Sequence, residues 1–285
     1  MADPRLITLC ADDFAFSPEV SAVIARLARG GCINAISCMA AMPGWTEDAR
    51  LLAGIGEADC GDGVGRVEVG LHLVLSSERP LGSLRCAGPD GRLPGRDRLL
   101  ALALTGRLDL AEIAAEINRQ FDAFTRAMGR APDFVDAHQH VHVYPGIRRL
   151  VIEATQRLAP YAWVRVPSDR LLAMLARPFA GKAIGSALQA IGMRRALRRA
   201  GLSCNGSFAG HYGFSGPYPT YLDAFLRCAS ANHLIMCHPG LGLAPGDGIA
   251  RARIREAEVI GEMPLRDRIA KRGSRPARFA AVSHG

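Results

Sequence analysis

The feature that most limits the fold of this chain is the repeated alternation of short apolar runs with amphipathic helical patterns. Between the runs, apolar residues recur at spacings of three and four, most clearly over residues 110–128, which Gly129 follows. A second helix is expected from Ser17 to about Arg29, and a third over residues 145–158. Apolar runs with the length of buried strands occur at residues 6–10, 33–39, 67–75, 134–137, 163–166 and 233–237. This order is typical of a parallel sheet with crossover helices.

About seven such strand–helix units fit into the chain, and none carries a Gly-rich dinucleotide-binding fingerprint. We therefore expect an α/β fold built as a (β/α) barrel, seven-stranded and incomplete, rather than a doubly wound sheet. A single catalytic domain is expected over residues 1–285, with a basic helical insertion at about 169–202. The Gly-, Pro- and Arg-rich stretch at 76–97 predicts an excursion loop near the open face.

The net charge of +8 is concentrated in the predicted insertion. Seven basic residues accompany one acid, Asp169, which leaves a local charge of +6. Two interpretations stay open: a solvated helix face, or a surface that contacts an anionic partner or a membrane. Nucleic-acid binding is not expected, because stacking aromatic residues are scarce, at 6% of the chain. The basic residues are Arg170, Arg177, Lys182, Arg194, Arg195, Arg198 and Arg199.

Several features point to a cytoplasmic protein. No apolar run reaches the roughly 18 residues of a membrane span, and the first residues lack the basic and apolar regions of a signal peptide. The eight cysteines show neither a C-x-x-C pair nor zinc-finger spacing. We expect reduced, structural cysteines in a reducing compartment.

Polar residues stand where the predicted strands end. Each has an ordinary explanation by itself, such as a helix-capping turn, a core histidine, a salt bridge or a tight turn. Together they are informative, because the carboxyl ends of parallel strands meet at one face of a barrel. These residues are Asp12 and Asp13 after the first strand, His72 within the third, Asp136, His138, His140 and His142 after the fourth, Arg165 in the fifth and His238 after a late strand.

The three closely spaced histidines suggest a metal site. If the segment is extended, alternation places His138, His140 and His142 on one side, and imidazole is a common ligand for divalent metals. One aspartate and two histidines would form an open site that keeps a position for water. A neighbouring carboxylate could then act as general base and another histidine as general acid.

With these motifs the chain resembles the YdjC-like carbohydrate deacetylases, which include the chitooligosaccharide deacetylases. The resemblance covers residues 5 to about 260 and implies a barrel related to that of the polysaccharide deacetylases. It rests on five motifs in the family's order: Ala11-Asp12-Asp13-Phe14, Gly70-Leu71-His72-Leu73, Asp136-x-His138-x-His140-Val141-His142, Arg165-x-Pro167 and His238-Pro239-Gly240.

The resemblance implies removal of an N-acetyl group from an amino sugar, oligosaccharide or glycolipid, with release of acetate. It also implies one divalent metal, magnesium by family habit, although zinc fits the ligands as well. Relatives form dimers, which suggests a homodimer. By resemblance, Asp13, His72 and His138 would bind the metal, Asp12 would be the base, His238 the acid and Arg165 the residue that orients Asp12. His140 and His142 would lie beside the metal or behind its ligands, and Phe208 near the substrate.

Two positions depart from the family pattern. Ala15 replaces the usual glycine, and Gly206 replaces an acid in the predicted loop 205–210, which concerns substrate identity more than chemistry. The basic segment resembles the branch linked to hopanoid biosynthesis, in which a lipid would carry the sugar and the enzyme would lie at the inner face of the membrane. Two alternatives stay open: another mononuclear metal amidohydrolase, and a non-catalytic sugar- or lipid-binding relative.

Overall fold

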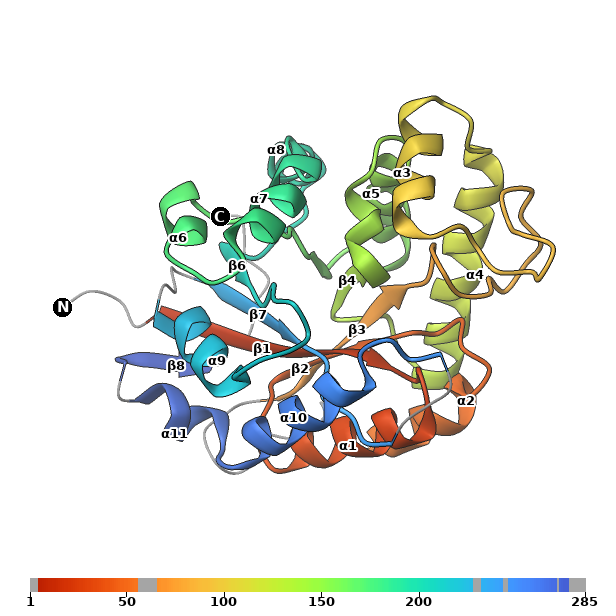
Figure 1. The fold of residues 1–285 in the computed structure, drawn as a ribbon. Coiled ribbons are helices and arrows are strands. Elements are labelled where there is room, and N and C mark those ends of the chain that lie inside the picture. Colours follow the sequence, from red (N-terminus) through yellow and green to blue (C-terminus); the bar gives the residue numbers. More distant parts are fainter. Residues whose placement is uncertain (1–4, 56–65, 228–231, 243–245, 271, 277–285) are drawn as a thin grey trace.

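The fold is built on one curled sheet of parallel strands (Figure 1). The structure is a computed structural model that describes residues 5–55, 66–227, 232–242, 246–270 and 272–276. Seven strands follow the order β5-β4-β3-β2-β1-β7-β6, and β8 pairs with the beginning of β1. The strands are β1 (Arg5–Phe14), β2 (Ala35–Cys38), β3 (Glu68–Leu73), β4 (Phe134–Ala137), β5 (Trp163–Val164), β6 (Ser207–Ala209), β7 (His233–Cys237) and β8 (Ser274–Pro276).

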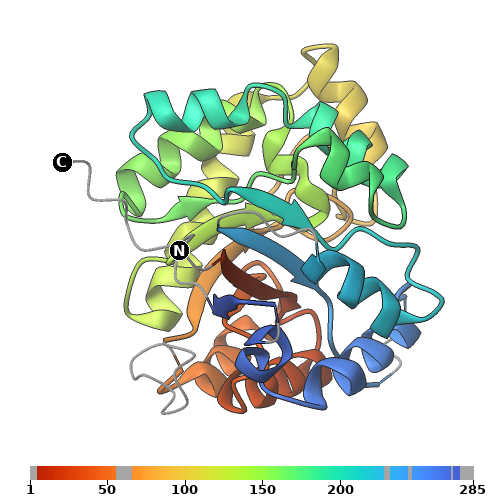
Figure 2. The same ribbon diagram turned by 90° about the vertical axis from the view of Figure 1, so that its left-hand side faces the viewer.

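Helices cover the outside of the sheet. In both views α1, α10 and α11 lie on one side, while α5, α7 and α8 lie on the other (Figures 1 and 2). The α-helices are α1 (Pro18–Arg29), α2 (Trp45–Asp48), α3 (Arg96–Leu104), α4 (Leu110–Met128), α5 (Ile147–Leu158), α6 (Leu171–Leu175), α7 (Ala180–Gln189), α8 (Met193–Arg199), α9 (Tyr218–Arg227), α10 (Ala250–Gly261) and α11 (Leu265–Ala270). Two 3₁₀ helices, η1 (Ala49–Leu52) and η2 (His138–Val143), complete the set.

The ends of the predicted helices carry the expected capping residues. The Ser17 hydroxyl accepts a hydrogen bond from the Val20 amide at the start of α1. At the start of α4 the Asp109 carboxylate accepts from two amides, and Gly129 ends the helix with φ 66°. The residues that face the sheet from these helices are buried, which confirms the periodicity predicted for both.

The two edges of the curled sheet meet at one point. Val164 at the end of β5 forms an isolated parallel bridge with Cys204, shortly before β6. The (β/α) barrel prediction, seven-stranded and incomplete, is therefore confirmed. The excursion at 76–97 is irregular up to α3 and lines the central cavity, as expected for a loop at the open face.

One predicted loop is in fact a strand. Residues 205–210 were expected to form a loop, yet Ser207–Ala209 is β6 and pairs with β7. The strand is only three residues long and stands between Gly206 and Gly210, so its sequence lacks a strand pattern. Gly210, at φ 116°, lets the chain run close to its neighbour, because a Cβ there would lie 2.4 Å from the Met236 carbonyl oxygen.

Two further expectations concern cysteines and membranes. The cysteines that the structure describes are all free, as predicted, and Cys60 and Cys228 lie outside the described residues. Among the described helices, none combines the length and apolar composition that crossing a bilayer requires.

Candidate active site

A β-bulge turns the two aspartates of β1 toward the same cavity. Between Ala11 and Phe14, β1 contains one more residue than the matching part of β2, so the regular alternation is interrupted. Asp13 adopts φ 65°, a conformation that aspartate tolerates better than most residues. Asp12 and Asp13 are both about 1% exposed and both line the cavity. The bulge thus places two adjacent carboxylates in one site.

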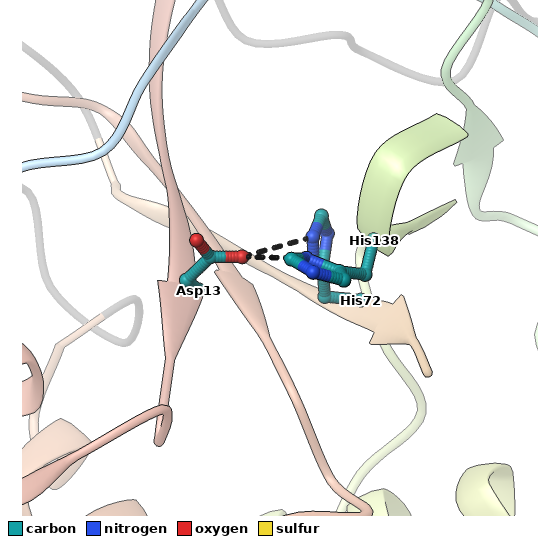
Figure 3. A group of neighbouring side chains, drawn as sticks. All are labelled: Asp13, His72 and His138. Atoms are coloured by element: carbon teal, nitrogen blue, oxygen red, sulfur yellow. Dashed lines mark hydrogen bonds and ion pairs between the residues drawn. The ribbon is translucent and has the colours of Figure 1, made fainter. Parts of the chain in front are cut away.

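Asp13, His72 and His138 form a compact group of metal-type donor atoms (Figure 3). Asp13 Oδ1 lies 3.4 Å from His72 Nε2 and 3.1 Å from His138 Nδ1. The three residues come from the ends of β1, β3 and β4, and one donor atom of each lies within 4.8 Å of the others. This carboxylate and two imidazoles fit a divalent cation and leave coordination positions open.

The chain orients His72 from behind. Its Nδ1 lies 2.7 Å from Asp136 Oδ1 and 2.9 Å from Ser37 Oγ, so Nε2 is the nitrogen directed at Asp13. Burial disfavours the charged imidazole, but Asp136 and Asp13 outweigh that effect and raise the pKa of His72 to about 10.

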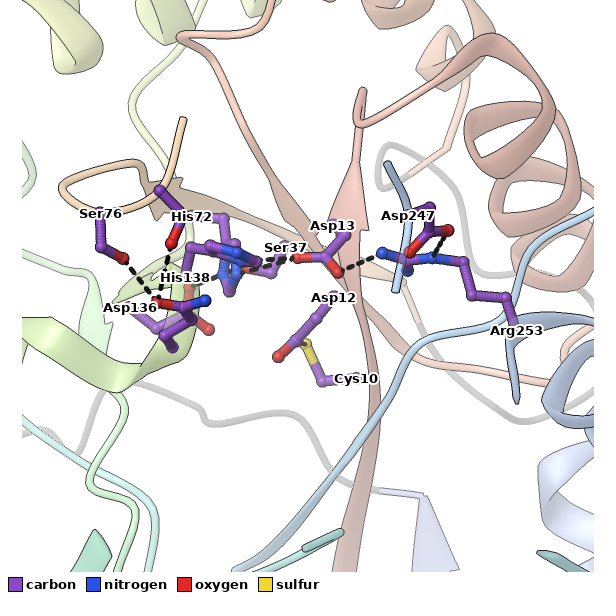
Figure 4. Close-up of polar contacts among 12 residues, drawn as sticks. Cys10, Asp12, Asp13, Ser37, His72, Ser76, Asp136, His138, Asp247 and Arg253 are labelled. Atoms are coloured by element: carbon purple, nitrogen blue, oxygen red, sulfur yellow. Dashed lines mark hydrogen bonds and ion pairs between the residues drawn. The ribbon is translucent and has the colours of Figure 1, made fainter. Parts of the chain in front are cut away.

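Arg253 of α10 anchors the other oxygen of Asp13 (Figure 4). Its guanidinium lies 2.8 Å from Asp13 Oδ2 and 2.8 Å from Asp247 Oδ2. Burial alone would raise the pKa of Asp13, but Arg253 and His138 hold it well below its usual range. Asp13 is therefore an ionised donor with one oxygen directed at the two histidines.

Asp12 and Asp136 share one buried arginine. Arg165, fully buried, forms a two-pronged ion pair with Asp12 at 2.6 Å for each oxygen. Its Nη2 also lies 2.6 Å from Asp136 Oδ2. Cys10, Asp12 and Asp136 form a second group with metal-type donors, but the Arg165 guanidinium lies among them and supplies the positive charge there.

The histidines after β4 do not share one side, so the prediction from alternation is wrong. The segment is the 3₁₀ helix η2, in which Gln139 and His140 have positive φ of 57° and 60°. His138 points to Asp13, whereas His140 lies beside Phe208 with ring centres 5.4 Å apart. His142 points away and places Nε2 2.8 Å from the Arg165 carbonyl oxygen. Alternation holds only for extended backbone, and this backbone turns.

His238 lies at the far side of the same cavity, directly after β7. Its amide donates to the buried Glu256 carboxylate, which also accepts from the Tyr212 hydroxyl. Its ring stands edge-on to Phe214, with centroids 5.4 Å apart. A buried carboxylate and an aromatic ring therefore fix the position of His238.

The cavity has a volume of about 670 Å³, which suits a sugar unit or a small oligosaccharide. One wall holds Lys182, which the sequence analysis counted only among the basic residues of the insertion, together with Ser186 and His211, which it did not single out. Ser186 Oγ lies 2.9 Å from His211 Nε2, and burial lowers the pKa of His211 to about 3. Burial also keeps the pKa of His140 well below its usual value, so both rings are neutral at pH 7.

All the predicted site residues except His142 either line the cavity or contact a residue that does. Arg165 lies beneath Asp12, and His142 lies beneath Arg165. No role was predicted for Asp136, although it opens the histidine motif. Nothing in the sequence identified Arg253 as a site residue, because it stands in an arginine-rich helix, 240 residues from Asp13.

Comparisons with known proteins agree with this arrangement. A carbohydrate deacetylase from Homo sapiens is 29% identical, covering 96% of this chain and 90% of its own length. A chitooligosaccharide deacetylase from Salmonella paratyphi B is 26% identical, covering 98% and 99%. A solved structure from Enterococcus faecalis, described as a candidate cellobiose-phosphate cleavage protein, has the same fold, with TM-score 0.71, 16% identity and coverage of 97% and 98%. The model of the YdjC-like protein family matches residues 6–271, and the chain therefore belongs to that family.

Proposed function

We propose that this protein is a metal-dependent hydrolase that removes the N-acetyl group of an amino sugar, oligosaccharide or glycolipid and releases acetate. One observation supports this most: an aspartate and two histidines with metal-type spacing stand next to a second buried carboxylate in one cavity. The relatives named carbohydrate deacetylase and chitooligosaccharide deacetylase support the substrate class.

Asp13, His72 and His138 would hold the cation. When bound, the cation supplies a Lewis acid that polarises the acetyl carbonyl. The donor set suits zinc by its imidazoles, while magnesium remains the expectation from the family. The firm placement of all three side chains, by Arg253, Asp136 and the η2 turn, favours a ready-made site.

Asp12 is proposed as the general base that takes a proton from the attacking water. Each of its oxygens accepts one hydrogen bond from Arg165, and Oδ1 also accepts from the Cys10 thiol, so Oδ2 keeps a second lone pair for water. Arg165 fixes the orientation of the carboxylate, which general-base catalysis requires. Arg165 is therefore a positioning residue in this proposal.

His238 is proposed as the general acid that protonates the departing amine from the far side of the cavity. The neutral rings of His140 and His211, together with Phe208 behind them, would form the wall against which the sugar lies. A sugar ring has apolar faces and hydroxyl edges, and this wall offers partners for both. His142 would act through Arg165, whose carbonyl it contacts.

The test is acetate release from a panel of N-acetylated amino sugars, oligosaccharides and glycolipids. Metal-stripped protein is compared with protein given back magnesium, zinc, manganese or cobalt one at a time. We expect release that depends on the metal and on an N-acetyl group. If folded, metal-loaded protein released no acetate from any of them, the proposal would be wrong. A screen of cyclic amides and amino-bases would then test the amidohydrolase alternative. Binding without turnover would favour a sugar- or lipid-binding protein.

A further inference from the structure

Helix α7 differs from a helix packed on a core, because its polar residues line the cavity while large apolar side chains at its end are exposed. None of its ten residues is buried. Its polar residues, among them Lys182, Ser186 and Gln189, line the cavity. Two apolar side chains at its end, Leu188 and, just beyond the helix, Ile191, are nevertheless 61% and 67% exposed. A surface helix normally turns its apolar residues inward. The side chains of Leu188 and Ile191 therefore lack a packing partner within the described chain.

Helix α6 extends the same apolar surface. Leu171, Leu172 and Leu175 are 57%, 80% and 55% exposed, and α6 packs against α7. Eleven large apolar side chains in the described chain are at least about a third exposed, and six of them lie in this short segment. We call these six the α6–α7 apolar face: Leu171, Leu172, Leu175, Phe179, Leu188 and Ile191.

The face is held firmly against the fold. Arg148 of α5 donates to the carbonyls of Gln189 and Ile191 at the end of α7. Lys182 donates to the Tyr212 carbonyl beside the cavity. Both ends of α7 are therefore tied to the fold, and the exposure of its apolar side belongs to the folded state.

Within residues 169–202, which carry the face, every exposed charged side chain is basic. Asp169, the acid of the segment, is buried in an ion pair with Arg177 at 2.8 Å. Arg194 is turned inward, toward the Ser168 and Asn205 carbonyls. The basic residues left exposed are Arg170, Arg195, Arg198 and Arg199, besides Lys182, which lines the cavity. Exposed leucines beside unpaired cations are typical of surfaces that lie in the interface of an anionic membrane.

We propose that the α6–α7 apolar face docks onto an anionic lipid bilayer and holds the mouth of the cavity at the lipid surface. A second copy of the chain fits less well, because a two-fold contact through this face would bring the same arginines together. The consequence for substrate, an N-acetylated sugar carried on a membrane lipid, rests on the proposed function. The docking itself does not.

The test uses the full-length protein in vesicle flotation. One set of vesicles is phosphatidylcholine alone, and the other contains about one quarter phosphatidylglycerol. The double variant Leu172→Glu/Leu188→Glu places acids on the face, and Leu104→Glu at the end of α3 is the matched control, since Leu104 is 67% exposed elsewhere. We expect the wild type and the control to float with anionic vesicles. The fraction of the double variant that floats should be at least about tenfold lower. Binding should fall as salt rises.

Several outcomes would overturn the docking proposal. The first is wild-type protein that stays in the soluble fraction with both vesicle types. The second is a double variant that binds anionic vesicles as well as the wild type does. A lipid-free dimer that the double variant converts to monomer, without vesicle binding, would assign the face to self-association instead. Acetate release from a soluble N-acetyl sugar should be equal in all three proteins. Its absence in every one of them would count against the proposed function and leave the vesicle result unaffected.

Discussion

Each buried aspartate of β1 has its own arginine. Arg165 holds Asp12 and Arg253 holds Asp13, and the two arginines come from opposite sides of the strand order, after β5 and from α10. Burying a carboxylate without a partner would be costly. Arg165 binds both oxygens of Asp12, whereas Arg253 binds one oxygen of Asp13 and leaves the other directed at the histidines. Two adjacent, identical residues therefore reach different roles through their partners.

Changing Asp12 to Asn should separate chemistry from metal binding. The amide keeps the shape of the carboxylate but accepts a proton poorly, so acetate release should fall by about 100- to 10,000-fold. Metal content, measured by elemental analysis after gel filtration, should stay at the wild-type value. Loss of the metal from Asp12→Asn would exchange the roles proposed for Asp12 and Asp13.

Changing Asp136 to Asn should weaken the metal site through His72. The carboxylate that orients the imidazole is lost, and removal of such a partner typically lowers metal affinity about 10- to 100-fold. Titration calorimetry with zinc measures this. Asp169→Asn is the matched control, because it breaks another buried Asp–Arg pair, one that does not include Asp13, His72 or His138. If both variants bound zinc like the wild type, His72 would not depend on Asp136.

Acid should destabilise the protein through buried neutral histidines, of which His233 is a clear case. Its ring is fixed by Ser207 Oγ at 2.6 Å and the Phe225 carbonyl at 3.1 Å, and burial together with nearby Arg177 lowers its pKa to about 3. The unfolded chain, with a histidine pKa near 6.5, then binds more protons than the folded one. Stability should therefore be complete above about pH 6.5 and fall toward pH 3, by up to about 1.4 kcal/mol per pH unit. Urea unfolding at pH 7, 6 and 5 tests it. The variant His233→Asn should show a shallower loss, and an unchanged slope would remove His233 from the account.

At the level of elements, sequence periodicity predicted the long pieces well and the short ones poorly. Helices α1 and α4 have enough turns for a pattern to appear, and both were predicted close to their observed ends. β6 is three residues long, and η2 departs from alternation through two residues with positive φ. Such conformations depend on the tertiary contacts of the backbone, which the pattern of apolar and polar side chains does not encode.

Within β3, position 70 must be glycine because the Phe134 side chain of the neighbouring strand β4 occupies the space of a Cβ atom. A Cβ at Gly70 would lie 2.4 Å from the Phe134 ring, and that ring stacks on Trp163 with centroids 4.4 Å apart. Gly70→Ala should therefore lower the free energy of unfolding by about 2 kcal/mol or more. Urea unfolding measures the difference. Gly181→Ala in α7, where the added Cβ meets nothing within 4 Å, should be neutral or stabilising. Equal effects of the two changes would mean that the stacked pair can move aside.

At the scale of the whole molecule, the candidate site exists only when distant strands meet. The order of the motifs was enough to predict which strand ends gather at one face, because parallel barrels gather them there. The partners of those residues were not predictable in the same way, since Arg253 reaches Asp13 from a helix that reads as an ordinary charged surface helix.

A ligand group spread over β1, β3 and β4 couples metal binding to global stability. The cation would bind the folded chain and not the unfolded one, so a metal at about 100 times its dissociation constant should add about 2.7 kcal/mol. Thermal unfolding followed by circular dichroism should show a higher midpoint with metal and a lower one with chelator. In His138→Ala the metal-induced shift should shrink strongly. A shift of wild-type size in that variant would move the binding site elsewhere.

The bridge between Val164 and Cys204 has a consequence for how such enzymes diversify. The chain leaves the sheet at one of these residues and returns at the other, while Arg194 links the Ser168 and Asn205 carbonyls across the gap. The residues from about 169 to 202 therefore form an insert whose two ends lie next to each other. Such an insert can be lengthened, shortened or exchanged between homologues with little change to the strands that carry the aspartates and histidines. Evolution, or a protein engineer, could in this way alter where the enzyme works and what it reaches while the reaction itself is inherited unchanged.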